Sequence, residues 1–134
     1  MGQVTTTYKG DMLFESQLGD HTVTIDGPET WGGKGRGPEP PQLFMSSIGS
    51  CVAVLVTHFC NEHDMDASGL KVSVEYDAGV HPTRFQNIKV KINAPNAICD
   101  DICMRETLEH IVKHCPVYES IVTLERVNFE LTTG

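Results

Sequence analysis

The segment from Pro41 to about Cys60 constrains the fold most, because it reads as one long helix with apolar residues on every side. Proline is tolerated at the first helical position, where its missing N–H would have no partner inside the helix. A helix that is apolar all round is expected to be buried on most sides, and one small sheet cannot surround it. We therefore expect a second subunit to cover part of it. Its apolar residues are Leu43, Phe44, Met45, Ile48, Val52, Val54, Leu55, Val56 and Phe59.

The residues before this helix predict a small sheet and a long loop. β-Branched and aromatic residues recur between turn signals and predict three short strands, over Val4 to Tyr8, Met12 to Gln17 and Thr22 to Ile25. The stretch from Gly27 to Pro41 is rich in glycine and proline and predicts an irregular loop.

Two further strands are predicted after the helix. Apolar and polar residues alternate from Leu70 to Tyr76 and from Ile88 to Ile92, and Val80 to Gln86 would connect the two runs. The pattern from Cys99 to Cys115 is helical, with its apolar residues grouped on one side.

The C-terminal residues are expected to form a turn and a last strand. Pro116 should end or kink the second helix, and a short turn through Tyr118 and Ser120 should follow. The last strand would carry Leu124, Val127, Phe129 and Leu131. The order βββ-α-ββ-α-β predicts an α+β fold in a single domain over residues 1–134.

Charge and composition narrow the class of partner. A formal charge of -8 and a pI near 5.1 disfavour nucleic acid and anionic membrane surfaces as partners. We see no signal-like segment near Met1 and no apolar run of membrane-spanning length, so a cytoplasmic location is expected. The five cysteines are an odd number, which argues against a disulfide framework. Cys60 is expected to have a structural or surface role, because free cysteines usually behave as small hydrophobic residues.

The second helix carries a stripe of possible metal ligands, namely Cys99, Cys103, His110 and His114. At 1.5 Å per residue the first and last would be about 22 Å apart, whereas tetrahedral zinc needs every ligand within about 2.3 Å. We therefore expect a solvated face here and no metal site.

Cys51 and Cys115 both point toward the expected core. Cys51 follows a run of small residues in the long helix, and Cys115 lies with the apolar residues of the second helix. Two buried thiols that meet could be structural, or one could attack a peroxide and the other resolve the sulfenic acid as a disulfide. Spacing alone leaves both interpretations open.

Two motifs resemble the OsmC/Ohr family. The first is a glycine-rich loop, Gly32 to Gly37, followed by a proline-containing helix start and a small-residue run that ends in Cys51. The second is Cys115-Pro116-Val117, which is similar to the family's Cys-Pro element. With the strand order, the likeness covers nearly the whole chain.

The resemblance implies an intertwined homodimer, with central helices wrapped by antiparallel sheets. It implies that Cys51 is the peroxidatic residue and Cys115 the resolving residue in the reduction of organic hydroperoxides. A dithiol, such as a protein-bound lipoyl group, would be the reductant, and no metal or organic cofactor would be needed. The alternative on the same fold is a protein that binds a hydrophobic ligand or senses oxidants.

The chain departs from the family pattern near the helix start. Where the hydroperoxide reductases carry a Glu that anchors an Arg beside the thiolate, this chain has Pro41, with Glu39 two residues earlier. Lys9 and Arg36 are then the candidate cations for the thiolate, although a Lys cannot form the bidentate fork with a carboxylate.

Three aromatic side chains are weaker candidates. Trp31 and Phe44 are possible pocket walls. His58 would lie roughly 10 Å along the helix from Cys51, so we expect a core or interface histidine instead of a catalytic base.

Overall fold

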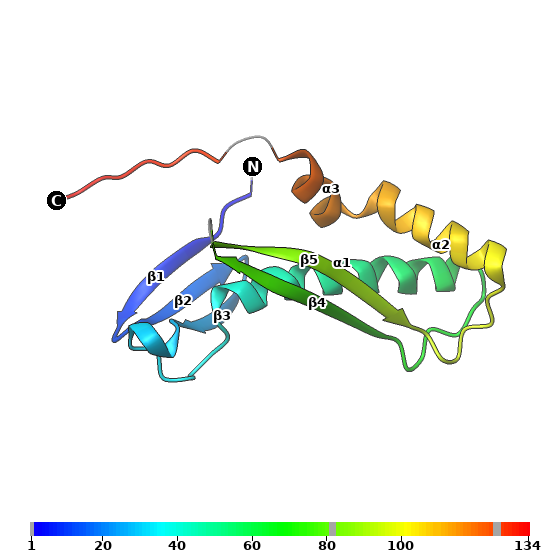
Figure 1. Cartoon of the computed structure of the whole chain (residues 1–134), viewed down its shortest axis with the longest axis horizontal. Coiled ribbons are helices and arrows are strands. Elements are labelled where there is room, and N and C mark those ends of the chain that lie inside the picture. Colours follow the sequence, from blue (N-terminus) through cyan, green and yellow to red (C-terminus); the bar gives the residue numbers. More distant parts are fainter. Residues whose placement is uncertain (1, 81–82, 125–126) are drawn as a thin grey trace. The chain divides into compact units, whose positions relative to one another are not determined.

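The computed structural model describes residues 2–80, 83–124 and 127–134. It divides into two compact units, Met1–Ser46 and Ser47–Gly134, which we describe one at a time (Figure 1). Together they have the α+β composition that the sequence predicts.

The first unit is a three-stranded antiparallel meander. Its strands are β1 (Thr5–Gly10), β2 (Leu13–Leu18) and β3 (His21–Asp26), in the order β1-β2-β3. All three were expected within two residues of these bounds. A short 3-10 helix, η1 (Glu29–Trp31), follows in the glycine-rich loop.

Two glycines let this loop fold closely against the meander. A Cβ at Gly33 would collide with the backbone oxygen of Gly27, and a Cβ at Gly37 would lie 2.5 Å from the backbone oxygen of Thr24. The loop is therefore packed backbone to backbone, which a larger residue at either position would prevent.

The second unit combines a hairpin with helices. Helix α1 (Pro40–Glu62) begins in the first unit and continues into the second, where β4 (Lys71–Val80) pairs with β5 (Thr83–Asn93) in antiparallel register. Helices α2 (Asp101–His114) and α3 (Pro116–Thr123) follow.

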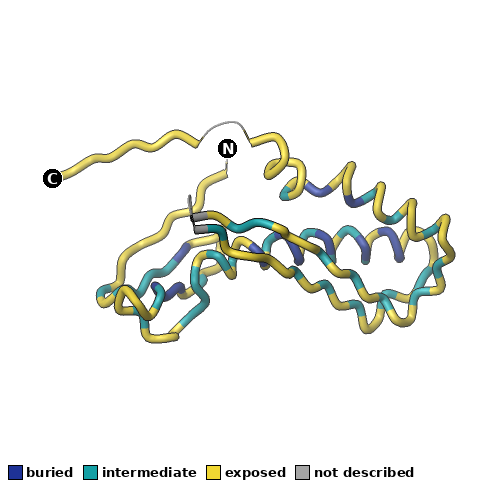
Figure 2. Tube along the Cα trace, viewed as in Figure 1, coloured by how far each residue is buried: buried dark blue, intermediate teal, exposed yellow. Residues whose placement is uncertain are grey.

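The core of this unit lies between α1 and α2. Val52, Val56 and Cys60 of α1 are buried with Ile111 and Cys115, and partly buried residues of the hairpin pack against them. Figure 2 shows buried stretches along α1 and α2 in dark blue. At Gly49 a Cβ would lie 3.2 Å from Val74 of β4, so a small residue is needed where α1 meets the hairpin.

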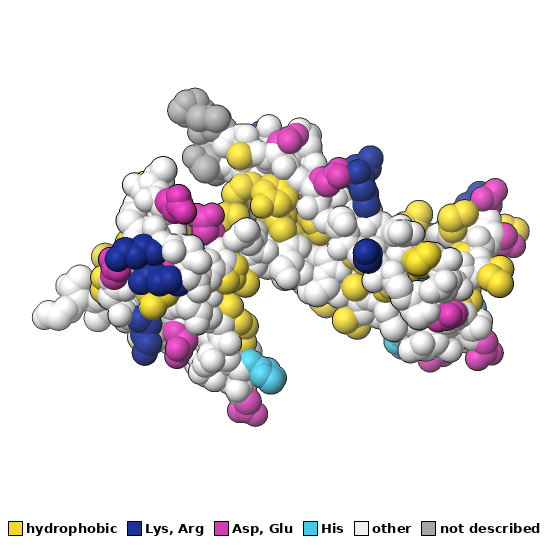
Figure 3. Space-filling view, turned by 90° about the horizontal axis from the view of Figure 1, so that it is seen from below, with side chains coloured by type: hydrophobic (Ala, Val, Ile, Leu, Met, Phe, Trp, Pro, Cys, Tyr) yellow, Lys and Arg dark blue, Asp and Glu magenta, His cyan; other side chains and the backbone are white. Residues whose placement is uncertain are grey.

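Helix α1 is not buried on every side in the single chain. Val54 is 68% exposed and lies in an open groove of about 460 Å³ with Thr57 and His58. Figure 3 shows hydrophobic side chains on the surface of the protein, and the exposed apolar residues of the second unit include Ile102, Leu108 and Val112.

Helix α1 corrects the expectation that no apolar run of the chain reaches membrane-spanning length. At 23 residues, with a mean hydropathy of 1.8 in its most apolar window, Pro40–Glu62 is long and apolar enough to span a membrane by length and composition. The core helix of a soluble protein meets the same criterion. Because Val52, Val56 and Cys60 pack against α2 and the hairpin, we assign α1 as a core helix.

The C-terminal region differs most from the prediction. The expected turn through Tyr118 and Ser120 is the helix α3, because Pro116 opens a new helix besides ending α2. The expected last strand is not formed in the described part of the tail, residues 127–134, where Phe129 and Leu131 are about nine-tenths exposed. A strand needs a neighbouring edge to bond its backbone, and no strand among the described residues pairs with residues 127–134.

The boundaries of two other elements also differ. Helix α2 begins at Asp101, with Asp100 as its N-cap, so Cys99 lies outside the helix that was expected to include it. The strands β4 and β5 extend to Val80 and from Thr83, well into the expected connection. Of that connection, residues 81–82 lie outside the described residues.

Candidate functional site

The structure brings together the two cysteines singled out in the sequence. The Sγ of Cys115 lies 3.0 Å from the Sγ of Cys51, and both residues are unbonded thiols. Disulfide sulfurs are about 2.05 Å apart, so a shift of about 1 Å would bond them. Cys115 is 1% exposed, whereas Cys51 is half-buried.

Cys115 sits at the junction of two helices. Its backbone N–H donates to Ile111 at the end of α2, and its Sγ accepts a hydrogen bond of 3.4 Å from the backbone N–H of Tyr118 in α3. The thiol is therefore the N-cap of α3, in a position usually held by Ser, Thr or Asp. This double role fixes the sulfur in the core.

The surroundings of Cys51 favour its protonated form. Burial raises the pKa of the Cys51 thiol above its ordinary value, and the neighbouring Cys115 adds to the rise. A backbone hydrogen bond from Val117 acts in the opposite direction and lowers this pKa. No Lys or Arg of the described residues is among the groups that shift it.

The first unit contains a buried ion pair that the sequence did not reveal. Asp26 is 1% exposed, and Arg36 donates to both of its carboxylate oxygens, from Nε at 2.7 Å and from Nη2 at 3.0 Å. The backbone N–H groups of Lys34 and Arg36 also donate to Asp26. These bonds hold the pKa of Asp26 far below its usual range.

Asp26 was missed because an Asp at the end of a strand resembles an ordinary turn residue. The available signal was the pair of cations, Lys34 and Arg36, in a glycine-rich loop that must fold back on that strand. The sequence also gave no reason to expect the N–H groups of Val117 and Tyr118 near the thiols, because α3 was not predicted.

The other candidate residues of the first unit are dispersed. Lys9 is exposed on β1, and Trp31 is 75% exposed at the end of η1. Phe44 of α1 is 42% exposed. Glu39 is not part of the Asp26–Arg36 ion pair. Its backbone N–H donates a hydrogen bond of 2.9 Å to the side-chain oxygen of Gln42.

The remaining cysteines correct two expectations. Cys99 and Cys103 form a disulfide, although no disulfide framework was expected. Neither residue is on a solvated face, since both are half-buried. Cys60 is 2% exposed, unpaired and part of the core, which fits the structural role expected of it.

Histidines gather between α1 and α2. The His110 ring lies 4.6 Å from His114, 5.7 Å from Phe59 and 6.1 Å from His58, measured between centroids. The ring of His63 stacks on the ring of Phe59, with the two centroids 4.1 Å apart. His110 was expected to be solvated, but its Nε2 is buried and has no hydrogen-bond partner among the described residues.

Burial lowers the pKa of His110, and positive charge on the neighbouring histidines lowers it further. Despite this clustering, no group of three His, Cys, Asp or Glu side chains in the described residues could hold a metal ion.

Comparison with known structures supports the fold assignment. A protein from Psychrobacter arcticus named for osmotic stress induction and detoxification response is 22% identical, with a TM-score of 0.78, over 90% of this chain and 88% of that one. An organic hydroperoxide resistance protein OsmC from Legionella pneumophila is 17% identical, with a TM-score of 0.63, over 90% and 88%. The organic hydroperoxide resistance protein OhrB of Bacillus subtilis is 20% identical, with a TM-score of 0.59, over 91% and 90%.

No curated protein sequence matches the chain. The model of the family described as OsmC-like protein matches residues 33–131, which include α1, the hairpin, α2 and α3. Both cysteines of the close pair lie within the matched segment. The chain therefore belongs to the OsmC-like protein family.

Proposed function

We propose that this protein reduces organic hydroperoxides, with Cys51 as the peroxidatic residue and Cys115 as the resolving residue. The observation that carries the proposal is the 3.0 Å separation of the two sulfur atoms, whose residues are 64 positions apart in the sequence. Two thiols at this distance can form and break a disulfide with little movement of the backbone.

The chemistry needs only these two sulfurs and an external dithiol. The Cys51 thiolate attacks the O–O bond and takes one oxygen, which gives a sulfenic acid and, with one proton, the alcohol. The Cys115 thiol then attacks the sulfenic sulfur, forms the disulfide and releases water. A dithiol restores both thiols by exchange and becomes a disulfide itself.

The difference in exposure supports the assignment of roles. The attacking sulfur must be reached by the peroxide, and Cys51 is half-buried whereas Cys115 is 1% exposed. The resolving sulfur needs only to be reached by Cys51.

The environment of the pair suits a peroxide with an organic group. Cys51, Leu55 and Val117 pack against the apolar core cluster. An apolar surround favours an alkyl or aryl hydroperoxide over hydrogen peroxide, because it offers the organic group burial but no hydrogen bonds. Two of the similar structures are named for organic hydroperoxide resistance, which agrees with this substrate class.

The raised pKa of Cys51 favours a second function, the binding of a hydrophobic ligand or the sensing of oxidants. The pKa of Cys51 is raised, chiefly by burial, and a thiol that stays protonated at neutral pH attacks peroxides slowly. On this alternative the protein binds a hydrophobic ligand or senses oxidants, and the two thiols react only occasionally.

The proposal includes the assembly and the location. Exposed apolar side chains on α1 and α2 favour a homodimer, in which the exposed tail could also find a strand to pair with. We keep a dithiol, such as a lipoyl group on a protein, as the reductant, the cytoplasm as the location, and no metal or organic cofactor for this reaction.

The two functions are separated by adding one equivalent of cumene hydroperoxide to the reduced protein and mapping disulfides by peptide mass. The enzyme is expected to form Cys51–Cys115 within seconds and to consume peroxide continuously with a dithiol. Cys51→Ser should abolish both results, whereas Cys60→Ser, which removes another buried thiol, should preserve them. Slow oxidation spread over several cysteines would overturn the peroxidase and favour the binding protein.

A further inference from the structure

Sulfur-bearing side chains gather at one end of the second unit. The chain has five cysteines and five methionines. Cys60, Met65, Cys99 and Met104 line one cavity of about 280 Å³, and Cys103 is bonded to Cys99. Half of the sulfur-bearing residues therefore meet at one place, away from the pair formed by Cys51 and Cys115.

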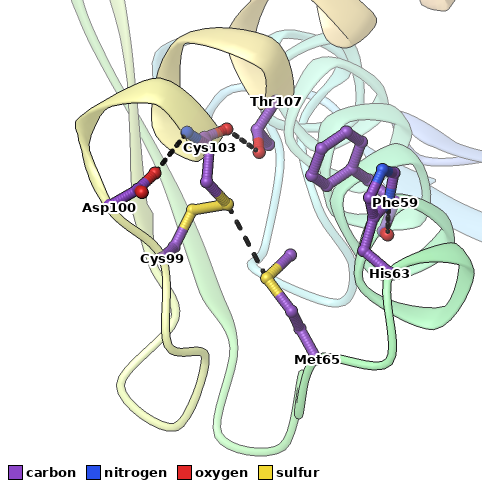
Figure 4. Close-up of a disulfide and its surroundings, with 7 residues drawn as sticks. All are labelled: Phe59, His63, Met65, Cys99, Asp100, Cys103 and Thr107. Carbon is purple, nitrogen blue, oxygen red and sulfur yellow. Dashed lines mark hydrogen bonds between the residues drawn. A yellow bond between two sulfur atoms is a disulfide. The ribbon is translucent and has the colours of Figure 1, made fainter.

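Three of these sulfurs are adjacent. Cys99 and Cys103 are joined as a disulfide, and the Sγ of Cys103 lies 3.7 Å from the Sδ of Met65 (Figure 4). Two ligands that each lie about 2.3 Å from one metal ion, at trigonal or tetrahedral angles, are themselves about 3.8 Å apart. The thioether of Met65 is thus already at ligand spacing from the nearer cysteine.

The backbone around Cys103 is fixed independently of the disulfide. Its N–H donates to Asp100 Oδ1 at 2.8 Å, and its carbonyl accepts a hydrogen bond from Thr107 Oγ1 at 2.8 Å. Reduction would therefore release the sulfurs without removing the contacts that start α2.

We propose that the reduced Cys99 and Cys103 bind one Cu(I) ion together with the thioether of Met65. Thiolate and thioether sulfurs are soft ligands that select Cu(I) over harder ions. A thioether as third ligand disfavours zinc, which takes thiolate, imidazole and carboxylate ligands, and no group of three such side chains among the described residues could hold a metal ion. Cys99 and Cys103 were among the possible metal ligands in the sequence, but Met65 was not, because it lies far from them along the chain.

The state of the disulfide controls the site. An external dithiol supplies two electrons and two protons to the Cys99–Cys103 bond and leaves as its own disulfide. Binding of Cu(I) then displaces the two thiol protons. Exchange of the two thiolates with an external disulfide, which takes up the two electrons and two protons and leaves as its dithiol, restores the S–S bond and releases the ion. The site is therefore loaded only under reducing conditions.

The test is an anaerobic titration of the reduced full-length chain with Cu(I), against bicinchoninate as a competing chelator. A Cys51→Ser background removes one sulfur of the other close pair, which would otherwise compete for the ion. We expect one equivalent bound tightly by the reduced chain and none by the chain with the disulfide intact. Copper binding by the oxidised chain with equal affinity would overturn the proposal.

Matched methionine variants identify the third ligand. Met65→Leu and Met104→Leu both preserve the volume of a cavity-lining side chain, so each should keep the fold. We expect Met65→Leu to weaken binding at least about tenfold and to reduce the sulfur coordination seen by X-ray absorption, while Met104→Leu does neither. Equal effects of the two substitutions would overturn the proposal.

Cysteine variants complete the test. Replacing Cys99 and Cys103 together by Ser should abolish tight binding, with circular dichroism used to confirm that each variant is folded. Tight binding retained by this double variant would show that other sulfurs hold the ion, and it would overturn the site. Since Cys51 is already replaced, neither result depends on the peroxidase proposal.

Discussion

The carboxylate of Asp26 is buried at the end of β3 and is held from two sides by Arg36, through the guanidinium and through the backbone N–H. The pair joins the meander to the glycine-rich loop of the same unit. Arg36 thus makes a bidentate contact with a carboxylate, here that of Asp26. In the hydroperoxide reductases that the sequence resembles, the carboxylate that anchors an Arg belongs to a Glu at the position of Pro41.

Replacing Asp26 should reveal the contribution of this pair to acid stability. The folded pKa of Asp26 is lowered from the ordinary 3.8, so the carboxylate stabilises the fold above that pH and loses its effect as the pH falls below it. We expect Asp26→Asn to lower the thermal midpoint at pH 7 and to differ less from the parent near pH 3. The measurement is thermal unfolding by circular dichroism across this range.

Asp11 provides a control for this substitution. Its side chain is 56% exposed and forms surface ion pairs with Lys34 at 2.6 Å and with Arg36 at 3.4 Å. Asp11→Asn should shift the midpoint by less than about half as much, because surface ion pairs contribute little. Equal shifts would mean that Asp26 has no special role.

The pH profile of Cys51 reactivity tests how its thiolate is formed. If burial alone sets its pKa, which is raised above 9.0, the alkylation rate should climb about tenfold per pH unit through neutral pH and show no plateau there. A cation beside the thiolate would instead produce a plateau near neutral pH. Iodoacetamide labelling of Cys51, followed by peptide mass, measures the profile.

The family resemblance nominates Arg36, Lys9 and Glu39 as residues that tune this thiolate. If Arg36 is the cation beside the thiolate, Arg36→Gln should lower the labelling rate at pH 7 about tenfold, the effect of one pKa unit, whereas the burial and Cys115 that raise the pKa of Cys51 predict no change. Lys34→Gln removes a cation from the same loop and should leave the rate unchanged. If Arg36→Gln labels at the parent rate, Arg36 has no influence on Cys51.

Local patterns in the sequence predicted most of the elements, whereas contacts that depend on two distant segments were harder to foresee. The strands of the meander and the start of α1 follow from alternation, turn residues and proline placement. The meeting of Cys51 and Cys115 was also accessible, because each lies on an apolar side of a helix. The Asp26–Arg36 pair was not, because it depends on how a loop without regular structure folds back.

Three errors toward the C-terminal end have separate causes. Pro116 was treated only as the end of a helix, although its fixed φ also suits the first turn of a new one. The last strand was predicted from its alternation alone, but a strand forms only beside a partner edge. Cys99 was placed on α2 because the N-cap signal of Asp100, which starts the helix one residue later, was not weighed.

Replacing Cys115 should separate the two halves of the peroxide reaction. Ser is a good N-cap, so Cys115→Ser should keep the start of α3 while removing the resolving thiol. We expect the first oxidation of Cys51 to continue and its sulfenic acid to accumulate, detectable as a dimedone adduct. Turnover with a dithiol should fall at least about tenfold. Unchanged turnover would exclude Cys115 as the resolving residue.

His110 should make the fold sensitive to mild acid. Its pKa is lowered from 6.5 by burial and by His114, His58 and His63, so the unfolded chain takes up the proton first as the pH falls below that value. Stability is therefore full above pH 6.5 and declines below it. His110→Phe removes the titrating group, so the thermal midpoint of this variant should fall less between pH 7.5 and pH 5 than that of the parent.

The exposed histidine of the first unit is the matched control for that change. His21 lies on β3 and is exposed, so His21→Phe should leave the pH dependence as in the parent. A parent-like loss of stability in His110→Phe would assign the acid sensitivity to other groups.

The exposed face of α1 tests the homodimer. Val54 is 68% exposed in the single chain, so a charged residue there should cost a monomer little stability. In a dimer packed through this face the same charge would be buried without a partner, which is strongly unfavourable. We predict that Val54→Asp converts a dimer to monomers in sedimentation analysis. Ile98→Asp, at a site that is 94% exposed before α2, should leave the mass unchanged. A parent chain that is monomeric at all concentrations, or a Val54→Asp dimer of unchanged affinity, would exclude this face as the interface.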